Sequence, residues 1–431
     1  MNRFRLLSLL ALGLGSALAT PAAEPTLTLA QAREMALQAH PRMKIAELRA
    51  MLAEEGVKEA RSAYLPLIAA NATAVGTGET TTRLAAGSLS NSQIYDHVGL
   101  DAVASMIVTD FGRTSNLTDA AKFRSRAAEA NLQVTRAQLL LEVDATYYAV
   151  LEAHAVMKVA AQTLSERQVV LERTKALAAN ALKSELDVRF ATVAVQEARL
   201  LENKAQNDWQ AALARLGNLL GLRTELTATL EEEREPLSEL APDPGPLVEA
   251  ALRERPDLLR QRFERDASLR TAQAAKVARL PTVSVVAAAG TVPVGDPKHF
   301  ERDFAAGGVN LNVPLFAGGL YRARQREAEL QAKDAEAGLT DAENNVVRDV
   351  RLAWLDSSHA REQILLTTSL LESASSALSL AQARFDQGLS SMVELNQAQL
   401  AQTSAAIAQA DAEYEYRVRR DILDYQTGSL H

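Results

Sequence analysis

The side chains that could carry catalysis or bind a metal are few, and their spacing fits neither role. The six histidines are His40, His97, His154, His299, His359 and His431. They form no HExxH motif and no pair four residues apart, so the spacing of metal ligands is missing. The sequence has no glycine-rich phosphate loop, no recognisable order of serine, histidine and aspartate, and no cysteine. It therefore predicts neither an enzyme nor a cofactor or metal site.

Two carboxylates stand out by their position. Asp187 and Glu394 lie 207 residues apart, each just after a break between two long helical stretches. An acid in the first turn of a helix stabilises the helix dipole and caps the N-terminus, which is an ordinary structural role. If several copies of the chain surround one axis, the same acid becomes part of a ring of like charges. The residues alone leave both roles open.

The composition favours long helices over a thick core. The chain has 431 residues, with 46 basic and 54 acidic side chains, a formal charge of −8 and a pI near 5.5. This balance argues against a partner made of nucleic acid, because such binders usually carry a basic surface. Hydrophobic residues make up 47% of the chain but aromatic residues only 4%, and much of the apolar share is alanine, the strongest helix former.

The N-terminus has the pattern of a secretory signal peptide. Arg3 and Arg5 precede an apolar run that ends at Leu18, and Ala19 closes a small-x-small cleavage pattern. We therefore expect a signal peptide at 1–19, with cleavage after Ala23 as the alternative, and no lipoprotein anchor because no cysteine follows. After the signal we expect no apolar helix of spanning length, so any membrane crossing should use β-strands.

An internal repeat organises the rest of the chain. Pro41 and Pro66 have counterparts 215 residues later, at Pro256 and Pro281. Beyond Pro281 the offset becomes 207 and stays there; the matched pairs are Val143 with Val350, Tyr147 with Trp354, Ala181 with Gly388, Ser184 with Ser391, Asp187 with Glu394, and Gly221 with Gly428. This register indicates an internal tandem duplication: repeat 1 at 20–222, an acidic, proline-rich linker at 223–246, and repeat 2 at 247–428.

Each repeat is predicted to contain a helical pair, a strand pair and a long helical hairpin. Helical pairs are expected at 29–63 and 247–278, strands at about 67–77, 97–108, 282–294 and 304–314, and hairpins at 112–222 and 318–428. The strands alternate between apolar and polar residues, as Val309 and Leu311 do with Asn310. We expect exposed loops between the paired strands, at Gly76–Ser92 and Pro293–Pro297.

A seven-residue spacing of apolar residues predicts left-handed supercoiled hairpins, with these residues in the seams. The outgoing helices carry Val143, Val150, Met157, Leu164, Leu171 and Ala178, then Val350, Ser357, Ile364, Leu371, Leu378 and Phe385. The returning helices carry Leu186, Val193 and Leu200, matched by Val393, Leu400 and Ile407. From Gly112 to about Ala179 no glycine or proline interrupts the outgoing helix, which would be about 100 Å long at 1.5 Å per residue.

Four strands per chain cannot close a barrel, and an open sheet edge cannot lie in lipid with unpaired backbone groups. We therefore expect copies to pool their strands. Three copies supply twelve strands, enough for an open lumen, and they arrange the hairpins as a second, helical cylinder. The expected fold class is an α+β membrane protein.

These residues resemble those of the TolC-type outer-membrane factors. The matching pieces are Leu27–Ala32, His40-Pro41, Tyr64-Leu65-Pro66, Arg255–Leu258, Leu280-Pro281 and Leu315–Gly319. The resemblance runs from about Leu27 to Gly428 and implies a homotrimer. It implies a 12-stranded outer-membrane β-barrel, a periplasmic α-barrel of coiled-coil hairpins, and localisation to the outer membrane among lipid. It also implies two partners, a periplasmic adaptor (membrane fusion protein) and an inner-membrane transporter of RND, ABC or MFS type.

The breaks in the long helices are the hairpin tips. From the residues, they are helix-to-helix turns with Gly388 ending one helix and Ser391 capping the next, in a capping box with Glu394. The resemblance implies that the adaptor docks here. The implied docking residues are Ala181, Leu182 and Ser184 in the first tip, and Gly388, Leu389 and Ser391 in the second.

The resemblance also implies a closable constriction near the tips. Glu394 matches the first acid of the family's charged ring, Asp187 is its duplicate, and Gln397 stands where some members have a second acid. Phe385 stands where the family often has a tyrosine that holds the closed state. The sequence cannot assign this gate from spacing alone, so these four residues are candidates.

Seven aromatic residues gather near the predicted strand ends: Tyr64, Tyr95, Phe111, Phe300, Phe304, Phe316 and Tyr321. They fit either a belt at the lipid headgroups or packing at the strand-to-helix elbows, and Phe111 and Phe316 favour packing. 

Taken together, the expected function is a passive exit duct of a tripartite efflux pump or a type I secretion system. The alternative is a periplasmic coiled-coil adaptor. An adaptor carries one hairpin, whereas this sequence predicts two hairpins and four strands.

Overall fold

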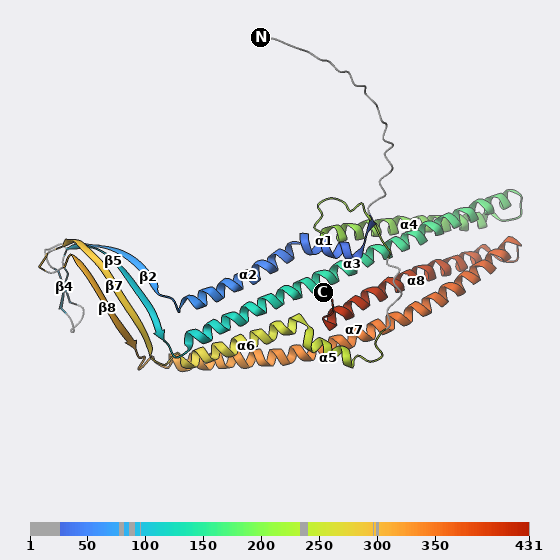
Figure 1. The fold of residues 1–431 in the computed structure, drawn as a ribbon. Coiled ribbons are helices and arrows are strands. Elements are labelled where there is room, and N and C mark those ends of the chain that lie inside the picture. The colour runs from blue at the N-terminus through green and yellow to red at the C-terminus, as the bar shows by residue number, and fades with distance from the viewer. Residues whose placement is uncertain are drawn as a thin grey trace, which may run out of the picture.

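The computed structural model describes residues 26–76, 82–85, 91–94, 96–232, 240–295, 297–298 and 301–430. The predicted signal peptide, part of the linker and four of the residues named above (Tyr95, His299, Phe300 and His431) lie outside these described residues. The molecule is elongated, with a β-sheet at one end and two helical tips at the other (Figure 1).

The sheet joins strands from both halves of the chain. Its strands are β2 (Leu67–Val75), β5 (His97–Thr109), β7 (Thr282–Gly295) and β8 (Asp303–Asn312). All neighbours are antiparallel, in the order β2-β5-β7-β8. The central pair therefore takes β5 from the first half and β7 from the second. The edges of the sheet are β2 and β8.

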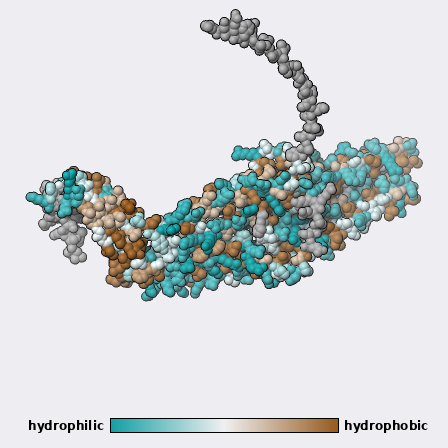
Figure 2. All heavy atoms as spheres, viewed as in Figure 1, coloured by the Kyte–Doolittle hydropathy of each residue, from teal (hydrophilic) through white to brown (hydrophobic). Residues whose placement is uncertain are grey.

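The two faces of the sheet differ in polarity. Across one face the register aligns Met106 with Val285 and then with Val309, so large apolar side chains form a row. On the other face Asn71 pairs with Asp101, and its Nδ2 donates to Asp101 Oδ2 at 3.0 Å. The apolar row is exposed, and Figure 2 shows hydrophobic residues gathered over the sheet where it meets the helices. This arrangement suits a sheet with lipid on one side and water on the other.

The loop predicted at Gly76–Ser92 is more structured than the sequence suggests. Two short strands pair antiparallel here: β3 (Thr82–Ala85) lies within the predicted loop, and β4 (Asn91–Ile94) begins in it and ends just beyond it. The loop prediction was wrong here because the segment is rich in serine, threonine and glycine. Such a segment lacks the alternation of apolar residues by which strands are recognised.

The helices of the two halves correspond in order and length. The first half has α1 (Leu29–Ala39), α2 (Pro41–Ser62), α3 (Arg113–Ala179) and α4 (Glu185–Leu219). The second has α5 (Gly245–Glu254), α6 (Pro256–Val277), α7 (Leu320–Asp386) and α8 (Met392–Thr427). Both α3 and α7 have 67 residues, so each is about 100 Å long.

The elbow between strand and long helix has the same backbone in both halves. Phe111 and Gly112 have φ of 56° and 89°, and Gly318 and Gly319 have φ of 57° and 86°. A left-handed conformation is easy for glycine but costs a residue with a Cβ roughly 1 kcal/mol. Phe111 therefore carries strain that its glycine counterpart in the second half avoids.

In the tip half of the molecule four helices form one layer in the order α4, α3, α8, α7 (Figure 1). Each hairpin packs within itself, α3 on α4 and α7 on α8, and the hairpins meet through α3 and α8. The seam predicted for the outgoing helices is confirmed in part, since Val143, Val150, Leu164 and Phe385 are buried. Leu171 and Val350 are buried as well. Other positions of this seam are only partly buried: Met157, Ala178, Ile364, Leu371 and Leu378.

The seam predicted for the returning helices was wrong. Leu186, Val193, Leu200, Val393 and Leu400 are exposed, Leu200 to 73%. The buried positions on α4 hold smaller residues instead: Ala191, Ala194, Val195 and Ala198. Alanine lets α3 and α4 approach closely, but its short side chain contributes little to a hydrophobic pattern. The larger leucines therefore dominate the pattern and predict the wrong face as buried.

The middle of the molecule ties the chain ends and the linker to the long helices. The short strands β1 (Thr26–Leu27) and β6 (Thr229–Leu230) pair in parallel. Tyr147 of α3 holds both, because its hydroxyl shares its one hydrogen between Leu27 O at 2.9 Å and Glu231 O at 2.8 Å. Its duplicate Trp354 acts in the same way, with Nε1 donating to Ala241 O at 2.8 Å.

We call the short helices α1 and α5, together with the β1/β6 pair, the collar. Its helix α1 is fixed to α3 by a partly buried ion pair. Arg33 donates through two nitrogens to the fully buried Asp144, at 2.6 and 2.8 Å. Two equivalent glycines then allow the long helices to end against the collar. A Cβ on Gly221 would lie 2.9 Å from Ala39 Cβ, and one on Gly428 would lie 3.2 Å from Arg255 N. Both glycines also have left-handed φ, of 73° and 82°.

One helix of the described chain, α7, is long and apolar enough to cross a membrane by length and composition. This corrects the expectation that no such segment follows the signal peptide. Its most apolar stretch, Ile364–Ala381, contains a single charged residue, Glu372. Most of this stretch is not buried, although the same helix packs along α8 in the hairpin. Its exposed leucines therefore form an open edge of the helical layer.

Candidate functional site at the hairpin tips

The two tips share one turn geometry although their sequences differ. Leu182 N donates to Leu177 O at 2.9 Å, and Leu389 N donates to Arg384 O at 2.8 Å. The residue before each leucine is left-handed, with φ of 59° at Ala181 and 71° at Gly388. These 6→1 bonds end the helices in the manner of a Schellman motif. The first tip thus keeps the turn of the second, at the strain of a left-handed alanine.

Each tip presents an exposed leucine followed by a helix-capping serine. Leu182 is 70% exposed and Leu389 is 64% exposed. Ser184 and Ser391 cap α4 and α8, their hydroxyls accepting from the backbone N–H groups of Asp187 and Glu394, both at 3.2 Å. The six candidate docking residues therefore form two similar small surfaces, each with one exposed leucine side chain.

The Asp187 side chain caps the N-terminus of α4. Its Oδ2 accepts from Ser184 N at 3.0 Å and from the Ser184 hydroxyl at 2.7 Å, which completes a capping box. The residue is partly buried against its own turn. The structural role considered for this acid is thus present in the geometry.

Glu394 is arranged differently from its duplicate. The capping box predicted at Ser391 and Glu394 is incomplete, because only the serine half of it forms. The Glu394 carboxylate lies instead 3.6 Å from Arg384 Nε, across the turn, with half of its side chain exposed. A glutamate is one methylene longer than an aspartate, which lets it reach the neighbouring helix. Glu394 and the exposed Gln397 remain open to solvent in the single chain.

Phe385 is a buried tip-to-tip contact. It is 1% exposed and lies in a cluster with Leu171 of α3 and Leu395 of α8. Lys183 of the first tip reaches across and places Nζ 3.8 Å from the centre of the Phe385 ring. A cation over an aromatic face is attracted by the ring quadrupole. Phe385 therefore joins the two tips through its ring face, where the family's tyrosine would have offered a hydroxyl.

An ion pair also joins the two hairpins beside this contact. Arg173 Nη1 of α3 lies 2.8 Å from Asp386 Oδ2 at the end of α7. Sequence reasoning missed Lys183 and Arg173, since neither is duplicated and both partners lie more than 200 residues away. Within the described residues, no hydrogen bond or ion pair joins Asp187 to Glu394. The structure thus brings Phe385 into contact with the first tip, whereas the side chains of Asp187 and Glu394 each interact within their own hairpin turn.

The aromatic residues near the elbows point outward. Phe316 is 91% exposed and Phe111 is 53% exposed, so packing within the chain is wrong for both. Tyr64 is exposed too, whereas Tyr321 is partly buried. Phe304 is also exposed but lies at the opposite end of β8, away from the elbows. Exposed aromatic rings at the base of an apolar sheet face are typical of residues at a membrane surface.

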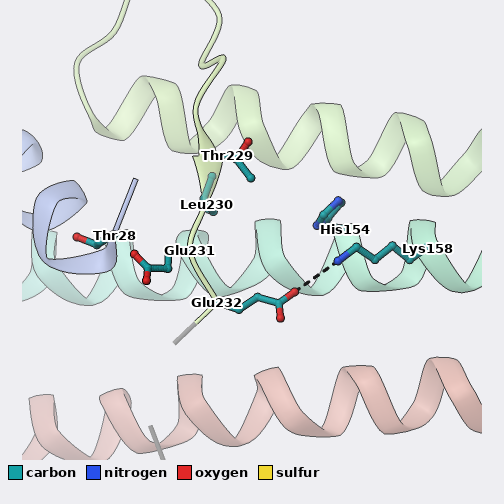
Figure 3. Close-up of a pocket in the computed structure, with 7 residues that line it drawn as sticks. All are labelled: Thr28, His154, Lys158, Thr229, Leu230, Glu231 and Glu232. Atoms are coloured by element: carbon teal, nitrogen blue, oxygen red, sulfur yellow. Dashed lines mark ion pairs between the residues drawn. The ribbon is translucent and has the colours of Figure 1, made fainter. Parts of the chain in front are cut away.

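A cavity of about 680 Å³ lies beside the collar (Figure 3). Its lining residues are Thr28, His154, Lys158, Thr229, Leu230, Glu231 and Glu232. Lys158 and Glu232 face each other at 3.5 Å, and His154 stacks on Trp209. Burial and Lys158 lower the pKa of His154, although Glu232 partly opposes this. The charges largely pair with one another, so the cavity fastens the linker to α3 and selects no clear class of ligand.

The described residues contain no group of three or more histidine, cysteine, aspartate or glutamate side chains placed to hold a metal ion. The family model for outer membrane efflux proteins matches residues 32–222 and 247–428, well over half of the chain.

Known proteins similar to this chain carry matching names. Outer membrane protein OprJ of Pseudomonas aeruginosa is 28% identical over 316 residues, which cover 71% of this chain and 64% of OprJ, just under two thirds of its length. Outer membrane protein TolC of Vibrio cholerae is 26% identical over 317 residues, or 69% of each chain.

Among solved structures, the outer-membrane channel OprN has a TM-score of 0.81 at 22% identity, and the match covers 93% of this chain and 90% of OprN. This likeness extends the agreement from sequence to fold. The chain therefore belongs to the family of outer membrane efflux proteins, which confirms the resemblance, the outer-membrane localisation and the non-enzymatic character expected from its sequence.

Proposed function

We propose that three copies of this chain form the outer-membrane exit duct of a tripartite efflux pump or type I secretion system. The observation that carries the proposal is the four-stranded sheet with an exposed apolar face and two free edges, β2 and β8. Joining β8 of one copy to β2 of the next satisfies both edges, and three copies make a closed barrel of 12 strands. The polar face with Asn71 and Asp101 then lines the lumen.

The helical layer supports the same assembly. Its edges are α4 and α7, on opposite sides of α3 and α8 (Figure 1). The α7 edge exposes Leu365, Leu366, Leu370 and Leu380. An exposed leucine row on a helix of a water-filled compartment needs a partner surface. We assign it to contact with a neighbouring copy, so that the hairpins form a periplasmic α-barrel below the β-barrel.

The architecture of each half supports a tandem duplication. Helices α3 and α7 have equal length, and Phe111 and Ala181, the non-glycine residues with left-handed φ among those described, stand where the second half has Gly318 and Gly388. We propose repeats at 20–222 and 247–428 on this basis, joined by the linker 223–246.

The tips are the proposed periplasmic end of the duct. We assign adaptor docking to the two exposed points at Leu182 and Leu389 with their capping serines, and the inner-membrane transporter to the far side of that adaptor. The gate is assigned to the same end. Lys183 on Phe385 and Arg173 on Asp386 hold the two hairpins of a chain together there, and Glu394 offers the less constrained of the two candidate acids.

The proposal is tested by fractionation and electrophoresis of the full chain. We expect the protein in the outer-membrane fraction, migrating as a trimer without boiling and as a monomer after boiling. In planar bilayers, the reconstituted protein should conduct NaCl. A soluble, compact monomer without the circular dichroism of β-structure would refute the duct and favour the periplasmic adaptor.

A further inference from the structure

The seam between α3 and α8, where the two hairpins of one chain meet, changes character along its length. Near the tips it is apolar, with Leu171 of α3 in one cluster with Met392 and Leu395 of α8. Near the collar it is apolar again, since Val418 packs against the cluster that contains Tyr148. Between these ends α3 and α8 carry buried polar side chains, Thr163 and Arg167 on α3 and Gln399 and Thr403 on α8. Apolar clusters therefore flank a stretch with buried polar groups.

The polar stretch is centred on a pair of threonines. Thr163 Oγ1 of α3 and Thr403 Oγ1 of α8 lie 3.3 Å apart, and both residues are buried. The two helices run antiparallel, so one turn closer to the tip places Arg167 on α3 and Gln399 on α8 at the same level. Asn396 follows on α8. We call Arg167, Asn396 and Gln399 the polar layer.

Each member of the polar layer has a buried atom without a hydrogen-bond partner. These atoms are Arg167 Nε, Asn396 Oδ1 and Gln399 Oε1. Arg167 is only 7% exposed and Gln399 only 5%. Burial lowers the pKa of the Arg167 guanidinium, and the charge of Glu197 offsets only part of that effect. Buried polar atoms lose hydration without replacement, so this layer opposes the closed seam.

Further toward the collar, like charges face each other across the same seam. The negative charges of Asp411 and Glu415 on α8 disfavour ionisation of the Glu152 carboxyl on α3. Glu415 also forms an ion pair with Arg419 of its own helix, at 3.1 Å. Burial, followed by these two acids, raises the pKa of Glu152 to about 7. Above that pH the carboxylates repel one another and add to the weakness of the seam.

We propose that the α3/α8 seam is metastable at the polar layer, so that the two hairpins of a chain separate and admit water there before either hairpin loses its own packing. Release of the contacts of Lys183 and Arg173 frees the tip end of the seam. The hydrophobic cluster that contains Tyr147 and Tyr148 acts as the hinge at the collar end. The link to opening of the duct rests on the function proposed above. Separation of the seam itself does not.

Separation of the seam is tested by the reactivity of single cysteines. The chain has no native cysteine, so each variant carries only one thiol. Thr163→Cys places a thiol in the seam. Thr367→Cys is the matched control, since Thr367 is also nine-tenths buried but lies on the part of α7 that packs on α8 of its own hairpin. In lipid vesicles at pH 7.5, a water-soluble maleimide should modify the cysteine at 163 at least tenfold faster.

A second experiment tests whether the polar layer is the cause. Adding Arg167→Leu and Gln399→Leu to Thr163→Cys should lower the reactivity to that of the Thr367→Cys control, because an apolar layer gains nothing from water. Equal reactivity at the two positions, or no effect of the leucine pair, would overturn the inference. Thr403→Cys repeats the measurement from α8 if the first variant fails to assemble.

The link to conduction is tested with Thr163→Cys/Thr403→Cys, whose side chains are close enough for a disulfide. We expect low NaCl conductance when it is oxidised and a several-fold rise on reduction, with both single variants insensitive to reductant. A reactive seam whose disulfide leaves conductance unchanged would reject its part in opening. A protein that inserts but conducts in no form would reject the duct while leaving the thiol result standing.

Discussion

Replacing Lys183 by alanine should loosen the contact between the two tips. The ammonium lies 3.8 Å from the centre of the Phe385 ring and is half-buried, so the cation–π contact contributes about 0.5–1 kcal/mol. The Arg173–Asp386 ion pair is partly exposed, which limits it to roughly 0–1 kcal/mol. Removing both should therefore shift the balance between closed and open tips by about 0.5–2 kcal/mol, or roughly 2- to 30-fold.

The assay is single-channel recording in planar bilayers. Lys183→Ala/Arg173→Ala should spend several-fold more time at high conductance than the parent, and Lys183→Arg should behave like the parent because a guanidinium also stacks on an aromatic ring. Lys175→Ala is the matched control, since Lys175 pairs with Glu172 on its own helix at 2.8 Å and does not cross to the other hairpin. If the double variant and the control open equally often, the tip ties do not hold the duct closed.

Four further changes test other parts of the reasoning. The pKa of Glu152 is raised from 4.5 to about 7, so the native protein should lose stability as the pH rises between these values. Glu152→Gln should remove that loss, which is about 1–2 kcal/mol after solvent screening. The variant should therefore have a higher Tm than the parent at pH 8 but not at pH 4. Glu394→Ala should raise single-channel conductance if the acid narrows the pore, and an unchanged value would exclude it. Gly388→Trp should leave the heat-modifiable trimer intact while abolishing export in cells, so continued export would exclude this tip as the docking surface. Leu164→Asp buries an unpaired charge in the heptad seam of α3 at a cost on the order of several kcal/mol, and a normal trimer on an unboiled gel would contradict that placement.

The long elements could be predicted because each has strong local signals. The outgoing helix expected from Gly112 to about Ala179 is found at Arg113–Ala179, since no breaker interrupts it and a left-handed glycine precedes it. The strand expected at 282–294 is found at Thr282–Gly295 because its valines alternate with smaller or polar residues. These features depend on residues that are neighbours in the sequence.

Features that depend on contacts between distant segments were harder to predict. The parallel pair of β1 with β6 joins two-residue strands about 200 residues apart, and neither strand is long enough to show alternation. The tip tie of Lys183 to Phe385 likewise crosses between hairpins, so only the folded chain brings the ammonium to the ring. The capping box formed at Asp187 and not at Glu394 because Arg384 competes for the longer side chain.

The central position of β5 and β7 has a consequence for how the molecule can be divided. A polypeptide holding one half alone would have a two-stranded ribbon and a single hairpin, and six such pieces would be required to build the proposed 12-stranded barrel. By covalently linking the halves, the chain fixes which ribbon meets which at one of every two junctions of that barrel. In the proposed trimer, recognition between separate molecules would then have to succeed at only three junctions, which leaves the two halves free to differ in sequence, as their tips do.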